Sequence, residues 1–359
     1  PPTIDVVRAV ADTDRWWRTW SDRCRHAGPW REAVVRSLLT LKALTYAPTG
    51  GIVAAPTTSL PEQLGGPRNW DYRYCWVRDA TFTLYALLVA GSVDEASAWR
   101  DWLLRAAAGD PAQLQIMYGV GGERRLDERE VPWLPGYEGS SPVRIGNAAS
   151  EQLQLDVYGE LMDCMHRTRN AGLPPSAEAW RLQAAVVAHV ESIWDEPDEG
   201  IWELRSGRRH LVHSKVMAWV ALDRAVKAVE RHGQAGPVAR WRALRARIHA
   251  DVCARGFDPA RGAFTQAYGS DALDASLLML PLVGFLPVDD SRVVGTVEAI
   301  RRELVQDGFV RRYATDEVRD GIPGGEGAFL PCTFWLADCL ALLGRRDEAR
   351  EIFERLLSI

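Results

Sequence analysis

The sequence lacks any apolar run near the roughly 18 residues needed to span a bilayer. Its first residues, Pro-Pro-Thr-Ile-Asp, do not place a basic segment before an apolar stretch, as a secretory signal would. The six cysteines are scattered, with no CxxC pair and no histidine at the spacing of a zinc site. We therefore expect a soluble, cytoplasmic protein with reduced thiols, no membrane contact, no metal and no organic cofactor.

A concentration of positive charge is also missing. The chain has 43 basic and 48 acidic residues, and the two signs are mixed along its length. Proteins that bind nucleic acid neutralise phosphates with a basic patch or stripe, which this sequence does not have. The charge pattern therefore excludes nucleic acid as the expected partner and favours a neutral or polar small substrate.

Apolar residues spaced three and four apart are abundant, and Gly, Pro and Asp residues separate them into segments. Alternating strand patterns are scarce, so the predicted fold class is all-α. Ser176 and Ser214 are expected to cap helices, and Gly91 and Gly233 to follow them. The predicted helices are 6–25, 31–46, 77–90, 93–108, 148–167, 176–194, 214–231, 237–254, 272–282, 291–305, 328–343 and 346–358.

The loops between these helices are the expected place for a site. About a dozen sequential helices with no evident linker suggest a closed double ring of helical hairpins. Loops longer than about 12–15 residues are usually functional where they are ordered. The stretches of this kind are 47–76, 109–147, 195–213, 256–271 and 306–327.

Three clusters in these loops combine aromatic and charged side chains. Arg78 and Asp79 end the segment 69–79, where their planar groups can each engage two sugar hydroxyls, although a structural ion pair is the alternative. Trp202 and Glu203 pair a stacking surface with a candidate acid. Arg312 precedes Glu326, for which capping of the next helix is the more common use. Glu128 and Arg144 are weaker candidates, because solvated loop charge explains most such residues.

The run Asn-Trp-Asp-Tyr-Arg-Tyr-Cys-Trp-Val-Arg-Asp at 69–79 resembles the signature of bacterial glucoamylase-type glycoside hydrolases, glycoside hydrolase family 15. That family includes trehalases and isomaltose-cleaving enzymes. The resemblance continues through Ala-Pro-Thr-Thr-Ser-Leu-Pro-Glu at 55–62, Val-Arg-Ile-Gly-Asn at 143–147, His-Ser-Lys-Val at 213–216 and Gly-Glu-Gly-Ala-Phe at 325–329. It implies an (α/α)6 barrel and an exo-acting, inverting hydrolase that releases glucose from the non-reducing end of trehalose, isomalto- or malto-oligosaccharides.

The resemblance also implies roles for single residues. Arg78 and Asp79 would bind the non-reducing glucose, Trp202 would wall the same subsite, and Arg312 would contact the sugar. Glu203 would be the general acid. Glu326 would shape or contact the sugar site, and a less favoured alternative makes it the base.

The family's general base is a glutamate C-terminal to the segment that holds Glu326, and we expect it beyond Ile359. The barrel, residues 31–359, is then expected to lack its closing segment, and residues 1–30 to form a linker-like helix. Bacterial members commonly carry an N-terminal β-sandwich. We expect this sequence either to be part of a longer protein that includes such a domain or to be a naturally short member. Two alternatives remain open: a catalytically inactive saccharide-binding helical domain, and a purely structural scaffold.

Overall fold

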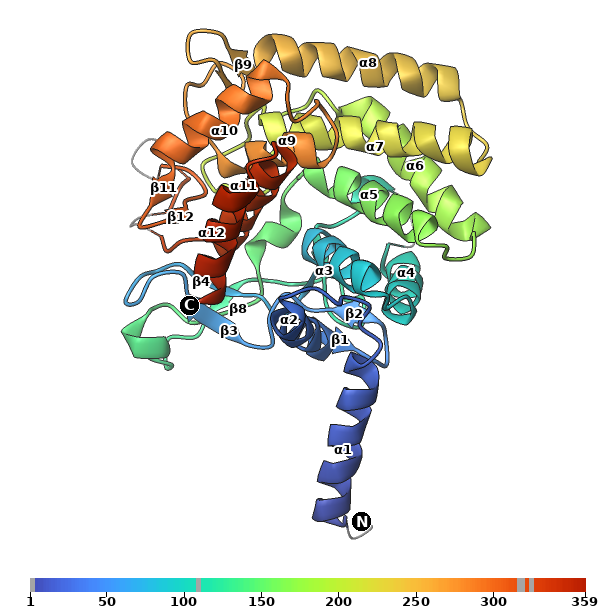
Figure 1. The fold of residues 1–359 in the computed structure, drawn as a ribbon, viewed down its shortest axis with the longest axis vertical. Helices are drawn as coiled ribbons and strands as arrows, with labels where there is room; N and C mark the ends of the chain where they lie inside the picture. The colour runs from blue at the N-terminus through green and yellow to red at the C-terminus, as the bar shows by residue number, and fades with distance from the viewer. Residues whose placement is uncertain (1–3, 108–110, 315–319, 323–325) are drawn as a thin grey trace.

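The computed structural model describes residues 4–107, 111–314, 320–322 and 326–359, and helices form most of this part of the chain (Figure 1). The helices are α1 Val6–Ser21, α2 Arg31–Ala43, α3 Val77–Ala90, α4 Asp94–Ala106, α5 Asp156–Asn170, α6 Ala177–Ile193, α7 Val212–His232, α8 Val238–Arg255, α9 Met279–Leu282, α10 Ser291–Glu303, α11 Leu330–Leu342 and α12 Arg346–Leu357. The short 3-10 helices are η1 Pro111–Gln113, η2 Tyr137–Gly139, η3 Ala148–Glu151 and η4 Ala275–Leu278.

The helices form an inner and an outer layer, as the burial of their side chains shows. Helices α5 and α7 are buried on nearly every side, whereas α6, α8, α10 and α12 bury one face only. In α8, for example, the buried residues are Trp241, Ile248 and Val252, which lie on one helical stripe. Inner and outer helices alternate along the chain, in agreement with the predicted (α/α)6 barrel.

The inner helices α5 and α7 pack closely because α5 has a glycine at the contact. A side-chain carbon on Gly159 would lie 2.2 Å from the carbonyl oxygen of Met217, so only glycine allows this approach. The ends of other helices follow the predicted signals. Ser176 caps α6 by accepting a bond from the Ala179 amide, and Gly91 and Gly233 end α3 and α7 in the left-handed conformation.

Three predictions about local structure were wrong. Ser214 does not cap a helix, because α7 already begins at Val212. The predicted helix 148–167 divides into η3 and α5, since residues 152–155 bind elsewhere: the amides of Leu153 and Leu155 donate to the carboxylates of Glu199 and Asp198. The predicted helix 272–282 likewise divides into η4 and α9.

Short antiparallel strand pairs occupy the loops, although alternating strand patterns are scarce in the sequence. The pairs are β1 Thr45–Tyr46 with β2 Gly51–Ile52, β3 Thr58–Pro61 with β4 Asn69–Asp71, β5 Cys75–Trp76 with β6 Met117–Tyr118, β7 Arg129–Glu130 with β8 Arg144–Ile145, β9 Phe257–Asp258 with β10 Ala263–Phe264, and β11 Val305–Gln306 with β12 Phe309–Val310. Each pair fixes the path of a loop between helices.

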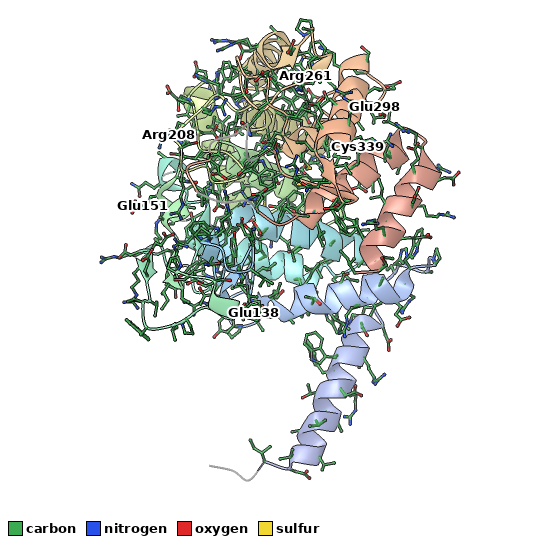
Figure 2. The ribbon with its side chains drawn as sticks, turned by 90° about the vertical axis from the view of Figure 1, so that its left-hand side faces the viewer. Glu138, Glu151, Arg208, Arg261, Glu298 and Cys339 are labelled. Atoms are coloured by element: carbon green, nitrogen blue, oxygen red, sulfur yellow. The ribbon has the colours of Figure 1, made fainter. Side chains whose placement is uncertain are left out.

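Helix α1 projects from the body, and only its C-terminal end is anchored there (Figure 1). The Trp20 indole donates to the buried carboxylate of Glu95, which Lys42 also contacts, both at 2.8 Å. Figure 2 shows charged side chains such as Arg208, Arg261 and Glu298 on the body, apart from this helix.

In the described residues, no helix combines the length and apolar character of a membrane span. All six cysteines are unpaired.

Candidate active site

A cavity of about 880 Å³ lies where the long loops meet the ends of inner helices α3 and α11. Its lining includes most of the residues that the sequence singled out, together with others. These lining residues include Glu62, Arg68, Trp70, Tyr72, Arg78, Asp79, Trp202, Glu203, Arg205, Arg312 and Asp320. Apolar residues of α2, α3 and α11 also line the cavity, among them Leu41, Phe82 and Phe334.

Glu203 lies in a tight turn that presents its carboxylate to the cavity. Its φ of 59° is in the left-handed region, which non-glycine residues rarely adopt, and Gly200 has a φ of 69° in the same turn. One carboxylate oxygen, Oε1, accepts a hydrogen bond of 2.8 Å from the Trp76 indole and one of 3.3 Å from Arg78. The carboxyl is therefore held by two donors and remains accessible from the cavity.

Arg78, in the first turn of α3, is surrounded by carboxylates. Its guanidinium lies 3.5 Å from Asp79, 3.8 Å from Asp156 and 3.3 Å from Glu203, and it donates to the Ile201 carbonyl. Asp156 is fully buried, and burial raises the pKa of its carboxyl to about 6. Arg78 thus neutralises several acids at once and fixes the orientation of Glu203.

Trp202 forms an aromatic wall beside Glu203. Its indole nitrogen donates to both carboxylate oxygens of buried Asp274, at 2.9 and 3.0 Å. The ring also packs against Phe329 and Trp335, with centroid separations of 5.8 and 6.2 Å. These contacts fix the plane of the ring, as a surface for stacking on a sugar requires.

Arg312 connects two carboxylates and lies over the Trp202 ring, 5.4 Å from its centroid. It forms an ion pair with Glu326 and lies 3.2 Å from Glu62, whose other oxygen accepts from the Trp70 indole at 3.0 Å. Burial raises the pKa of Glu62, and the charge of Arg312 opposes that shift. The Glu326 side chain is only 3% exposed and does not line the cavity, so it contacts Arg312 and not the cavity itself.

The structure therefore brings five predicted residues, Arg78, Asp79, Trp202, Glu203 and Arg312, to one cavity, with Glu326 directly behind it. Sequence reasoning assigned no role to Glu62, Tyr72, Trp76 or Asp156. The first three lay within the quoted motifs, so their aromatic and acidic character was a usable signal. Asp156 had none, because it opens a helix like many capping acids.

The described residues contain no group of three or more His, Cys, Asp or Glu side chains arranged to hold a metal ion. The chemistry available in the cavity is that of carboxyl groups, guanidinium groups and aromatic surfaces. A carboxyl beside a fixed aromatic wall suits proton transfer to a bound sugar.

A family model described as glycosyl hydrolases family 15 matches residues 28–359. The chain belongs to this family. Trehalase of Mycolicibacterium smegmatis is 47% identical to it over 369 residues, which cover 99% of this chain and 54% of that protein. Trehalase of Mycobacterium tuberculosis is 45% identical over 100% of this chain and 53% of its own length. The family 15 chain thus spans about half the length of these curated relatives.

Solved structures share the fold of this family 15 chain. A structure described as a wild-type glycosidase superimposes with a TM-score of 0.70 at 23% identity, covering 90% of this chain and 81% of the other. A glucoamylase from Saccharomycopsis fibuligera gives a TM-score of 0.62 at 14% identity, covering 90% of this chain and 72% of its own. At these identities the likeness concerns the arrangement of helices, and it confirms the predicted fold class.

Proposed function

We propose that this chain forms the catalytic part of a hydrolase that releases glucose from the non-reducing end of α-glucosides, with trehalose as its substrate. The observation that carries the proposal is the Glu203 carboxylate in the cavity, held by Trp76 and Arg78 beside the wall formed by Trp202. The choice of trehalose is supported by curated relatives named trehalase, which are 47% and 45% identical to this chain.

In the proposed mechanism, Glu203 is the general acid. It gives its proton to the glycosidic oxygen as the bond from that oxygen to the anomeric carbon breaks. The Trp76 and Arg78 donors stabilise the carboxylate that remains. Arg78, Asp79 and Arg312 hold the hydroxyl groups of the glucosyl unit whose anomeric carbon is attacked, Trp202 stacks on its ring, and the other sugar leaves with the protonated oxygen.

Inversion requires a second carboxylate, which activates a water on the opposite face of the sugar at a separation of roughly 6.5–9.5 Å. The family resemblance implies that this base is a glutamate in a segment C-terminal to the one that holds Glu326. The contacts of Glu326 argue against its serving as a substitute, because Arg312 takes its carboxylate and it does not line the cavity. Glu326 is instead proposed to orient Arg312.

The test is glucose release by the full-length protein from trehalose, isomaltose and maltose. Glu203→Gln removes the proton but keeps the shape, and it is expected to lower kcat on trehalose by about 10²–10⁴-fold. Glu196→Gln is the matched control, since Glu196 is an exposed acid in the same loop and is expected to leave kcat unchanged. NMR spectra recorded early in the reaction should show β-glucose from the attacked unit.

Unchanged turnover in Glu203→Gln would refute the assignment of the acid. The alternative of a saccharide-binding domain without catalysis gives a different result. In that case the full-length wild-type protein would bind glucose or trehalose in calorimetry but release no glucose from any of the three sugars.

A further inference from the structure

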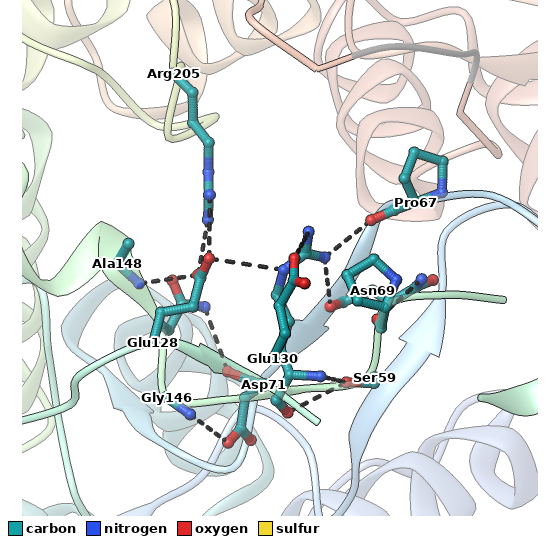
Figure 3. A network of polar contacts seen from close by, with 12 residues as sticks. Ser59, Pro67, Asn69, Asp71, Glu128, Glu130, Gly146, Ala148 and Arg205 are labelled. Atoms are coloured by element: carbon teal, nitrogen blue, oxygen red, sulfur yellow. Dashed lines mark hydrogen bonds and ion pairs between the residues drawn. The ribbon is translucent and has the colours of Figure 1, made fainter. Parts of the chain in front are cut away.

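Arg205 follows Glu203 by two residues, lines the cavity and points toward the Glu128 carboxylate (Figure 3). Its guanidinium donates two hydrogen bonds to the Glu128 carboxylate, at 3.2 and 2.9 Å. Its carbon centre lies 4.3 Å from the centroid of the Trp70 ring. A bidentate ion pair and a cation–π contact therefore hold the end of the turn that contains Glu203.

Glu128 is itself held firmly by the neighbouring loop. Its carboxylate accepts from the Ala148 amide at 3.1 Å and lies 3.6 Å from Arg144. Although burial alone would raise the pKa of Glu128, the hydrogen bond from Arg205 is the main influence that keeps it below its usual value. Glu128 thus links the turn of Glu203 to the loop between β6 and β8 (Figure 3).

Trp70 is held in place by contacts with two arginines and one acid. Arg144 covers it at 4.5 Å and Arg205 contacts it at 4.3 Å, while its indole donates to Glu62. Arg144 in turn donates to the carbonyls of Pro67 and Asn69. Trp70 is only 9% exposed, so it cannot serve as an open stacking surface for a sugar.

The turn of Glu203 needs external support because its backbone is strained. A non-glycine residue in the left-handed region persists only where its surroundings fix it. The supporting contacts act on both sides of the residue: Gln152 donates to the Glu203 carbonyl at 3.3 Å, and the Arg205 amide donates to the Asp320 carbonyl at 2.9 Å. The Arg205 side chain adds the contact with Glu128.

We propose that Glu128 and Arg205 are positioning residues that hold Glu203 where it can protonate the leaving group. This inference rests on the proposed function, in which Glu203 is the general acid. Neither residue is proposed to touch the reacting atoms; they act through the backbone of the turn. A misplacement of about 1 Å in a catalytic group can lower the rate about a hundredfold.

Two substrates separate this role from a general structural one. In trehalose, the bond from C1 to oxygen breaks while Glu203 gives a proton to that oxygen, and water supplies the new C1–O bond. In α-glucosyl fluoride, the C1–F bond breaks and fluoride leaves as the anion, so proton donation by an acid matters much less. A misplaced Glu203 should therefore slow trehalose hydrolysis more than fluoride hydrolysis.

The experiment compares Glu128→Gln with Glu130→Gln in the full-length protein. Glu128→Gln removes the charge of the bidentate partner, whereas Glu130 is a nearby, 64% exposed acid whose contact is with Arg144 at 3.9 Å. We expect Glu128→Gln to lower kcat on trehalose about tenfold or more and to change kcat on the fluoride by less than about threefold. Glu130→Gln should change neither.

Arg205→Lys provides an independent variant, because it keeps the charge but loses the planar fork. It should show the same preference for the fluoride. Equal losses on both substrates, no loss on trehalose, or failure of both variants to fold in circular dichroism would overturn the positioning role. A wild-type protein inactive on both substrates would instead refute the proposed function, and this inference with it.

Discussion

Replacing Asp274 with asparagine is expected to destabilise the protein by about 3 kcal/mol and to weaken sugar binding. The Asp274 carboxylate is buried and receives three donors: the Trp202 indole, the Gln266 amide at 2.9 Å and the Ser276 backbone amide at 2.8 Å. No described contact has Asp274 as a donor. An asparagine keeps one oxygen and places an NH2 group where the other was.

The magnitude follows from which donor loses its partner. If the NH2 group replaces Oδ1, the Ser276 amide is left unpaired; if it replaces Oδ2, the Gln266 amide is. Gln266 cannot turn over freely, because its oxygen accepts from Arg209 at 3.0 Å. Each bond to a charged acceptor contributes about 1.5–3 kcal/mol, and a buried unpaired donor costs about 1–3 kcal/mol. Burial raises the pKa of Asp274, because a buried charge is unfavourable. Removing that charge in the variant therefore offsets part of the lost free energy of unfolding.

Urea denaturation measures the free energy of unfolding, and KM for trehalose measures sugar binding. Asp271→Asn is the matched control, since Asp271 is exposed three residues away and should change stability by less than about 0.5 kcal/mol. We expect KM to rise about tenfold in Asp274→Asn only, because Trp202 keeps only one of its two acceptor oxygens and its ring plane is then less firmly fixed. A loss of stability below about 0.5 kcal/mol, or an unchanged KM, would refute the reasoning.

Two further predictions concern the inner helices. Gly159→Ala should destabilise the protein by about 1–3 kcal/mol in the same assay, although alanine favours helices, because the new carbon would lie 2.2 Å from the Met217 oxygen. Asp156→Asn should remove a pH dependence. The folded pKa of Asp156 is raised from 3.8 to about 6, so its contribution to stability is complete below pH 3.8 and is lost as pH rises through 6. Relative to wild type, the free energy of unfolding of the variant should increase by about 3 kcal/mol between pH 4 and pH 7. A difference that stays constant with pH would contradict the assignment.

The sequence predicted most helices well, because their apolar spacing is a local signal that tertiary contacts reinforce. Ser176 and Gly233 mark real helix ends for the same reason. Residues 152–155 were misassigned because their amides bind Asp198 and Glu199, which lie more than forty positions later in the chain. Local sequence patterns, on which the helix prediction rests, cannot reveal bonding partners at that separation.

The candidate site divides in a similar way. Arg78, Trp202 and Glu203 stand in compact motifs, so sequence reasoning could select them, and the structure places them at one cavity. The Glu128–Arg205 pair joins residues 77 positions apart, and neither residue differs locally from ordinary loop charge. Asp156 likewise has an unremarkable sequence context, and only its burial beside Arg78 distinguishes it.

The contact between Glu62 and Arg312 joins residues 250 positions apart, with the turn of Glu203 contributed from the middle of the chain. No short fragment can therefore assemble the cavity, and contacts of such long range form slowly during folding. In a refolding experiment with the full-length protein, the return of the proposed activity would accordingly report the formation of the contact between Glu62 and Arg312, later than the return of helical signal from local segments.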